Sequence, residues 1–552
     1  MKIMKFLIKA IQDIIKKDFF IIFGIAFFNH LPYGINRYFF GKYSKLPIFI
    51  KILKDFLSFS GFFILVFGIV LILYIFNKKI KDIILKLVYF ISFMLFFIEV
   101  FLIFIFKSLI SPTIVQILLE TNKDEILEFL VTYINLKLLL LLIIVLLSCY
   151  FFKKLKFKIN IFNKKYNILE YIIFLSIVIK LFSINSELYV FNIIRLYKSV
   201  KISYNNIKEY NKIFNNLDKN NISIILDNSK IKNIVLVIGE STTRNHMSLY
   251  DYPLETNPLL KKLEMTGNLY KFTNTISPHA HTIPVLKKLL TFYNYESLDK
   301  CYSYNNIVSI MNKANYETFW FSNQESSGIY GNVAVALGSK SNFILFNKLH
   351  DSSDSDIDGY YDEQIIDKSI EHLKKSSEKN FIIYHLLGTH ADYKKRYPKN
   401  FDIFQNKNKV ISQYDNAILY NDYVVNKIIS NFQDKEAIII YVSDHGEEVY
   451  DFRNFSGHAE SNPSRYMVEI PFLIYVSNKF KENYPDIIKK IENSLDRPYM
   501  TDDLIHTILD ISNIKTLEYD ETRSIINERF NIFRKRIFSE KEYDIYWINQ
   551  NK

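Results

Sequence analysis

The sequence predicts a multi-pass α-helical membrane domain followed by an α/β domain with a central, mostly parallel sheet. Residues 1–185 are crowded with Phe, Ile and Leu, a composition typical of membrane spans. Beyond them, continuous apolar runs end in polar side chains, as expected for parallel strands buried on both faces. We therefore expect a membrane domain over 1–185, a bridging helical segment over 186–230 and an α/β domain over 231–552, because 552 residues leave room for several domains.

Five apolar stretches are candidate membrane spans. Leu57–Phe76 and Leu87–Phe106 are the strongest. Leu138–Phe152 and Leu169–Ile184 are short for a hydrocarbon core of about 30 Å and need flanking aromatic residues and lysines to extend them. Phe19–Asn29 is the core of a weaker first span. The net charge of +12 comes with lysines that flank these spans, which favours a membrane partner over nucleic acid.

Lysine asymmetry predicts the orientation. Segments 77–86 and 153–168 carry four and six lysines, whereas 108–136 has one lysine among four acidic residues. The lysine-rich segments should be cytoplasmic, which places everything after Ile184 outside the cytoplasm. The basic segment 32–55 breaks this rule if Phe19–Asn29 spans the membrane. Met1–Lys17 is too long and basic for a cleaved signal. Cys149 and Cys301 are not expected to pair, so the outer domain should lack disulfides.

Polar side chains that can bind a metal follow three predicted strands. They are Glu240 after 233–239, His390 at the end of the run 381–390, and Asp444 with His445 after 437–443. Run 469–476 resembles a fourth strand. In open α/β sheets ligands bind outside the carboxyl ends of the strands, and carboxylates and imidazoles are ordinary zinc ligands. A single strand that ends in such a residue could simply lead into a polar turn. Three strands that end in this way predict a metal site assembled across a sheet.

Thr282 lies just before Pro284 and an amphipathic run, where a helix N-cap is expected. It could be simply a cap. Alternatively, a hydroxyl at a helix N-terminus and next to a metal can lose its proton and attack phosphorus. The helix dipole would favour a phosphate at the same place. The two interpretations are compatible, because a cap uses only one lone pair.

These residues resemble the membrane-anchored phosphoethanolamine transferases of the alkaline phosphatase/sulfatase superfamily, which include lipid A-modifying and colistin-resistance enzymes. The matching motifs lie at 237–250, 277–284, 387–390, 443–447 and 457–458. The resemblance covers nearly the whole chain and implies a sulfatase-like outer domain. It implies a bacterial inner-membrane enzyme with a periplasmic catalytic domain. The expected donor is phosphatidylethanolamine, and the expected acceptor is lipid A or a lipooligosaccharide core, although the sequence does not identify it.

The resemblance also implies individual roles. One zinc ion would be bound by Glu240, Thr282, Asp444 and His445. Thr282 would be the residue that becomes phosphoethanolaminylated. His390 and His458 would hold a second metal or protonate the leaving group, so one or two zinc ions are expected.

The chain departs from the family pattern in two respects. Its two cysteines cannot reproduce the family's disulfides. In addition, Asn323 and Gln324 stand near the position of a family lysine. They are candidates to contact the phosphoryl oxygens or the amine, with a polar loop as the alternative. Thr121 and Glu125, in the acidic segment, are candidates to meet the ethanolamine, with a solvated loop as the alternative.

Other functions fit less well. A phosphoglycerol transferase of the lipoteichoic acid synthase type shares the architecture and a threonine nucleophile, and a phosphatidylglycerol donor assay would separate it. A sulfatase is disfavoured because Ser277 is followed directly by Pro278, outside the Cys/Ser-x-Pro-x-Arg context of formylglycine. A membrane scaffold without catalysis would not need so many convergent polar groups.

Overall fold

The computed structural model describes residues 2–39, 48–76, 78–106, parts of 109–118, 191–216, 222–325, 333–348 and 361–548. The chain divides into two compact units, Met1–Asn205 and Asn206–Lys552. The finer boundaries at residues 185 and 230 remain predictions.

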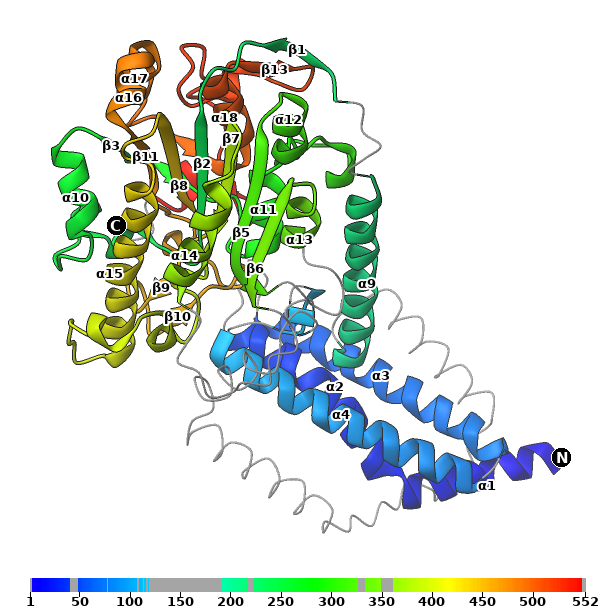
Figure 1. Ribbon diagram of the computed structural model, residues 1–552. Helices are drawn as coiled ribbons and strands as arrows, with labels where there is room; N and C mark the ends of the chain where they lie inside the picture. Colours follow the sequence, from blue (N-terminus) through cyan, green and yellow to red (C-terminus); the bar gives the residue numbers. More distant parts are fainter. Residues whose placement is uncertain are drawn as a thin grey trace. The chain divides into compact units, whose positions relative to one another are not determined.

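The first unit is helical (Figure 1). Its helices are α1 (Lys2–Lys17), α2 (Phe19–Phe39), α3 (Ile48–Phe76), α4 (Lys78–Phe106) and the beginning of α9 (Asn192–Asn216). Among the residues that the structure describes, three stretches are long and apolar enough to cross a membrane: Phe19–Asn36, Asp55–Tyr74 and Lys79–Phe104. They coincide with the first three predicted spans, and α2 packs against both α3 and α4. The predicted spans Leu138–Phe152 and Leu169–Ile184 lie outside the described residues.

Several buried polar side chains of this unit pair with one another, as an apolar environment favours. Arg195, fully buried at the beginning of α9, donates from Nε to Glu99 Oε1 at 2.8 Å and from Nη2 to Oε2 at 2.5 Å. Asn29 donates to Ser92 Oγ at 2.9 Å, so α2 and α4 are also linked. The bonds of Arg195 attach the beginning of α9 to α4.

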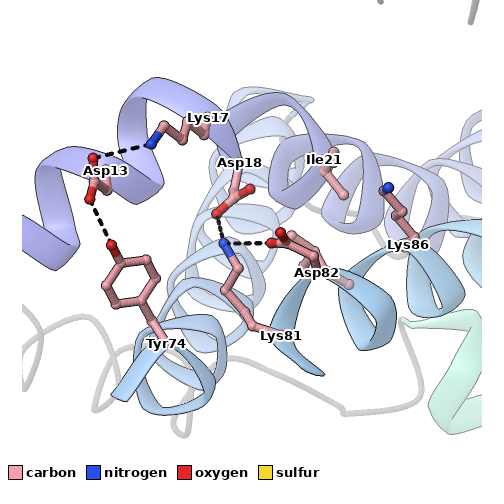
Figure 2. A pocket seen from close by; sticks show the side chains of 9 residues that line it. Asp13, Lys17, Asp18, Ile21, Tyr74, Lys81, Asp82 and Lys86 are labelled. Atoms are coloured by element: carbon pink, nitrogen blue, oxygen red, sulfur yellow. Dashed lines mark hydrogen bonds and ion pairs between the residues drawn. The ribbon is translucent and has the colours of Figure 1, made fainter. Parts of the chain in front are cut away.

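A charged pocket lies where α1, the beginning of α2, the end of α3 and the beginning of α4 meet (Figure 2). Lys81 is almost fully buried and pairs with Asp18 and, at 3.0 Å, with Asp82. Tyr74 donates its hydroxyl to Asp13 at 2.6 Å. These contacts join α1 to the other helices at the lysine-bearing end of α4, which the sequence predicts to be cytoplasmic.

The second unit contains a seven-stranded sheet with strand order β3-β11-β8-β2-β7-β5-β6 (Figure 1). The strands are β2 (Asn233–Gly239), β3 (Leu269–Phe272), β5 (Glu317–Glu325), β6 (Phe343–Lys348), β7 (Asn380–His385), β8 (Ala437–Ser443) and β11 (Phe472–Val476). Of these seven, only β11 runs opposite to the others. The mostly parallel sheet predicted from the sequence is confirmed. The fourth predicted strand begins later than expected, after Pro471, which cannot donate a ladder hydrogen bond.

Helices cover both faces of this sheet (Figure 1). On one face lie α10 (Pro258–Met265), α14 (Asp362–Leu373) and α15 (Lys409–Ser430); on the other lie α11 (Thr282–Leu289), α12 (Ile307–Lys313), α13 (Val333–Gly338) and α18 (Leu504–Ser512). The remaining helices are α16 (Asn478–Asn483), α17 (Pro485–Glu492) and α19 (Tyr543–Tyr546). Short strands outside the main sheet are β1 (Ile224–Asp227), β4 (Thr275–Ile276), β9 (Glu448–Val449), β10 (Ser456–Gly457), β12 (Tyr499–Met500), β13 (Ile514–Thr516), β14 (Ile537–Phe538) and β15 (Lys541–Glu542).

The register of the central strands determines where their polar ends lie. Every residue of β2, β7 and β8 is buried, which explains their continuous apolar sequences. Ile238 pairs with His385 and Gly239 pairs with Ser443. The residues that follow these strands therefore meet at one edge of the sheet.

Candidate metal centre and nucleophile

Three buried side chains converge at this edge: Glu240, Asp444 and His445. His445 Nε2 lies 3.2 Å from Glu240 Oε1 and 3.5 Å from Asp444 Oδ2. One ligand atom from each residue lies within 4.8 Å of those of the other two. The two carboxylates and the imidazole that the sequence suggested as metal ligands are thus brought together.

The hydrogen bonds around this group fit a metal ion. His445 Nδ1 lies 2.9 Å from the carbonyl oxygen of Gly446, so Nδ1 carries a proton and Nε2 is the nitrogen that faces the two carboxylates. Nε2 and Asp444 Oδ2 are both buried and have no hydrogen-bond partner among the described residues. A buried polar atom without a partner is costly, whereas a ligand atom on zinc is satisfied. The donor set therefore suits zinc.

The electrostatics of the carboxylates lead to the same conclusion. Burial and the nearby carboxylate of Glu240 raise the pKa of Asp444 to about 8. Burial alone would also raise the pKa of Glu240, but the adjacent His445 holds it well below its ordinary value. Two buried carboxylates cannot both be ionised cheaply unless a positive charge lies between them. A divalent cation would supply that charge.

Thr282 is the first residue of α11, and the N-cap position belongs to His281. The interpretation of Thr282 as an N-cap is therefore wrong. Its hydroxyl instead donates to Glu240 Oε2 at 3.0 Å. This contact places a nucleophilic oxygen beside the candidate metal ligands, at the N-terminus of a helix.

The segment before α11 is attached to the metal-binding turn. Ser277 Oγ donates to the carbonyl oxygen of Asp444 at 2.5 Å. Two residues before Thr282, the backbone N–H of Ala280 donates to Glu460 Oε1 at 3.0 Å. His279 Nδ1 binds the same carboxylate oxygen at 2.8 Å. These contacts fix the segment 277–280, which precedes Thr282, to Asp444 on one side and to Glu460 on the other.

His458 and His390 lie near this group. His458 Nδ1 donates to Glu447 Oε2 at 2.6 Å, and its ring lies 4.3 Å from that of His445. His445, Glu447 and His458 form a second group whose ligand atoms lie within 4.8 Å. Burial lowers the pKa of His390, which feels the charges of Glu240 and Glu447. Both histidines are therefore near the group, as expected from the sequence.

Asn323 and Gln324, the candidate substrate contacts, behave differently. Gln324 Nε2 donates to the carbonyl oxygen of Leu386 at 3.0 Å and lies 3.5 Å from Glu240 Oε2. Asn323 uses its amide inside the protein, donating to Asp362 at 2.8 Å and accepting from Asn347 at 2.8 Å. Gln324 alone of this pair has a described contact with the metal-binding group. Thr121 and Glu125 lie outside the described residues.

Two further residues were not singled out from the sequence. His385, the last residue of β7, is buried, and its Nε2 has no hydrogen-bond partner among the described residues. The charge of Glu240 acts on it, while burial lowers its pKa to about 4. Asp362 accepts from the backbone N–H groups of Leu387 and Gly388 at 2.8 and 2.9 Å and so holds the turn before His390. An imidazole at the end of an apolar strand could have indicated His385 from the sequence. No feature of the sequence around Asp362 indicated its role.

His246 is the third residue missed. Its Nδ1 lies 2.6 Å from Asp415 and its Nε2 lies 3.0 Å from Asp451, so both nitrogens donate and the ring is an imidazolium. Burial opposes this charge, but Asp415 and Asp451 raise the pKa of His246 to about 9. Asp451 also accepts from Val449 N at 2.8 Å, in the strand that follows Glu447. His246 thus connects the segment after β2 to α15 and to the β9–β10 pair.

Comparisons with known proteins agree with this geometry. The sulfatase family model matches residues 232–514. Phosphoethanolamine transferase EptC of Escherichia coli K12 is 36% identical over 317 residues, 54% of each chain, and EptA of Helicobacter pylori is 32% identical over 267 residues, 46% of this chain and 49% of that one. The chain spans about half the length of these curated relatives.

Solved structures extend the likeness. The C-terminal periplasmic domain of E. coli EptC, in complex with zinc, is 34% identical with a TM-score of 0.52 and covers 59% of this chain and 97% of that one. Full-length EptA from Neisseria meningitidis covers 92% of this chain and 97% of that one, with a TM-score of 0.61. At 17% identity it supports the fold alone. The predicted resemblance to phosphoethanolamine transferases and the predicted fold class are confirmed, and the chain belongs to the sulfatase family.

Proposed function

We propose that this protein transfers phosphoethanolamine from phosphatidylethanolamine to an acceptor in the bacterial cell envelope, lipid A or a lipooligosaccharide core, through a covalent intermediate on Thr282. The observation that carries the proposal is the hydrogen bond from Thr282 Oγ1 to Glu240 Oε2 within a buried group of carboxylates and an imidazole. The relatives named as phosphoethanolamine transferases favour this donor over phosphatidylglycerol.

Zinc would be held by Glu240, Asp444 and His445 together with the hydroxyl oxygen of Thr282. When bound, zinc lowers the pKa of that hydroxyl and spreads the negative charge of the phosphoryl oxygens. Whether one or two ions are present depends on the second group of ligand atoms, from His445, Glu447 and His458.

The chain's own residues carry the proton transfers. The hydroxyl proton of Thr282 leaves along its hydrogen bond, Oγ1 forms a bond to phosphorus, and the bond from phosphorus to the diacylglycerol oxygen breaks. His390 or His458 gives that oxygen its proton. In the second step the deprotonated histidine takes the proton of the acceptor hydroxyl, and the acceptor oxygen forms a bond to the same phosphorus. The bond from phosphorus to Thr282 Oγ1 breaks, and the proton returns to Oγ1 from Glu240. His458 is oriented for this role because its Nδ1 is held by Glu447.

Both substrates are amphiphiles, which suits an enzyme with apolar spanning helices. We propose that the helical unit lies in the inner membrane with the catalytic unit on its periplasmic side. The lysine-rich beginning of α4 would then be cytoplasmic.

A donor assay tests this proposal. The full-length protein, in detergent with zinc, is given phosphatidylethanolamine or phosphatidylglycerol, and diacylglycerol release and headgroup transfer to lipid A are measured. We expect release and transfer from phosphatidylethanolamine and their loss in Asp444→Asn. Equal use of phosphatidylglycerol, or release that survives in Asp444→Asn, would contradict the proposal.

A further inference from the structure

A phosphoethanolamine group carries an ammonium that needs an acceptor wherever the group is bound. Most carboxylates of the site already have partners for their oxygen atoms. Glu240 and Asp444 belong to the metal-binding group. Glu447 uses one oxygen to accept from Tyr393 at 2.6 Å and the other to accept from His458 at 2.6 Å. The ammonium therefore needs a different partner.

Glu460 is a carboxylate with one committed and one available oxygen. Its Oε1 accepts from Ala280 N and is bound by His279, as described above. Its Oε2 has no partner among the described residues, and the side chain remains 29% exposed. The carboxylate is thus held in position by two donors yet open to a ligand.

Its position relative to the nucleophile also fits. Ala280, whose N–H binds Glu460, lies two residues before Thr282, a span of at most about 7 Å. In a phosphoethanolamine group four bonds of roughly 1.5 Å separate phosphorus from nitrogen. Glu460 also lies two residues after His458, whose ring lies 5.3 Å from that of His281, the residue before Thr282. An ammonium attached to phosphorus at Thr282 can therefore reach this carboxylate.

We propose that Glu460 is the residue that recognises the ammonium of the transferred group and so selects an aminoalkyl arm over an uncharged one. This inference rests on the proposed function. The bonds from Ala280 N and His279 keep Oε1 in place, so that Oε2 is presented to the ammonium without loss of side-chain freedom on binding. A charge-assisted hydrogen bond then adds to the attraction.

The test compares two small ligands of the same length. O-phosphoethanolamine carries an ammonium where n-propyl phosphate carries a methyl group. Their affinities for the full-length, zinc-loaded protein are measured by titration calorimetry. The wild type should bind O-phosphoethanolamine at least tenfold more tightly. Glu460→Gln should bind the two ligands alike with its affinity for propyl phosphate unchanged, whereas Glu460→Asp should keep part of the preference.

His279→Gln is the matched control, because it removes one bond to Glu460 but leaves the carboxylate. It should retain the preference for O-phosphoethanolamine. A wild type without preference, or a Glu460→Gln variant that keeps it, would overturn the inference. So would an equal loss of affinity for both ligands, which would make Glu460 a structural anchor. Failure of the proposed function is distinguishable, because it would appear as a missing adduct on Thr282 whatever the ligand preference.

Discussion

Replacing His246 with Gln should destabilise the catalytic unit in a manner that depends on pH. The imidazolium of His246 donates to Asp415 and to Asp451, and all three groups are largely buried. Gln can reach the same region but carries no charge. The variant therefore leaves two carboxylates without the cation that compensates them.

The size of the effect follows from the pKa of His246. The pKa is about 9 in the folded protein and 6.5 ordinarily, and this difference corresponds to roughly 3.5 kcal/mol at about 1.4 kcal/mol per pH unit. Because the folded state holds the proton more tightly, this stability is fully present below pH 6.5 and is lost as the pH rises through 9. Between pH 7 and pH 9.5 the advantage of the wild type over His246→Gln should shrink by roughly 2.5 kcal/mol.

Tryptophan fluorescence during urea unfolding measures this difference in the full-length protein. The chain has two tryptophans, Trp320 and Trp547, and both are buried in the second unit. His506→Gln is the control: burial lowers the pKa of His506 to about 3, so it is neutral throughout the range. The loss in free energy of unfolding caused by His506→Gln should therefore stay constant with pH. If the loss in free energy of unfolding caused by His246→Gln is also constant with pH, or increases as the pH rises, the reasoning is refuted.

Three further predictions concern other contacts. Removing zinc with a chelator should lower the free energy of unfolding by about 3–4 kcal/mol if zinc is supplied at 100 to 1,000 times its Kd, but should leave Asp444→Asn unchanged in a thermal melt. Asp362→Asn should cost about 2 kcal/mol, since the 387–388 turn loses a charged acceptor; chemical denaturation would measure it. Arg195→Met should lower the thermal midpoint in detergent by leaving Glu99 unpaired, at a cost of about 3–5 kcal/mol, and adding Glu99→Met should restore most of it.

Much of the fold was predictable because its strands are buried on both faces. β2, β7 and β8 are continuous apolar runs, and parallel strands of that kind bring their carboxyl ends to one edge. Glu240, Asp444 and His445 could therefore be grouped from the sequence. The direction of β11 could not, since a short apolar run looks the same whichever way it pairs.

Contacts between distant parts of the chain were beyond the sequence. His246 is separated from Asp415 by 169 residues and from Asp451 by 205, and nothing near it distinguishes an imidazolium from an ordinary core histidine. Asn323 lies beside Gln324, yet successive residues of a strand face opposite sides, and of the two Gln324 is the one that approaches Glu240. The position of Thr282 in its helix was missed because helix boundaries are uncertain by a residue or two.

The central claim is that Thr282 carries the transferred group. The most direct test is the intact mass of the full-length, zinc-loaded protein after incubation with phosphatidylethanolamine, followed by fragmentation to locate the modification. We predict a gain of one phosphoethanolamine on Thr282 and no gain in Thr282→Ala. An adduct on another residue, or one that persists in Thr282→Ala, would contradict the account.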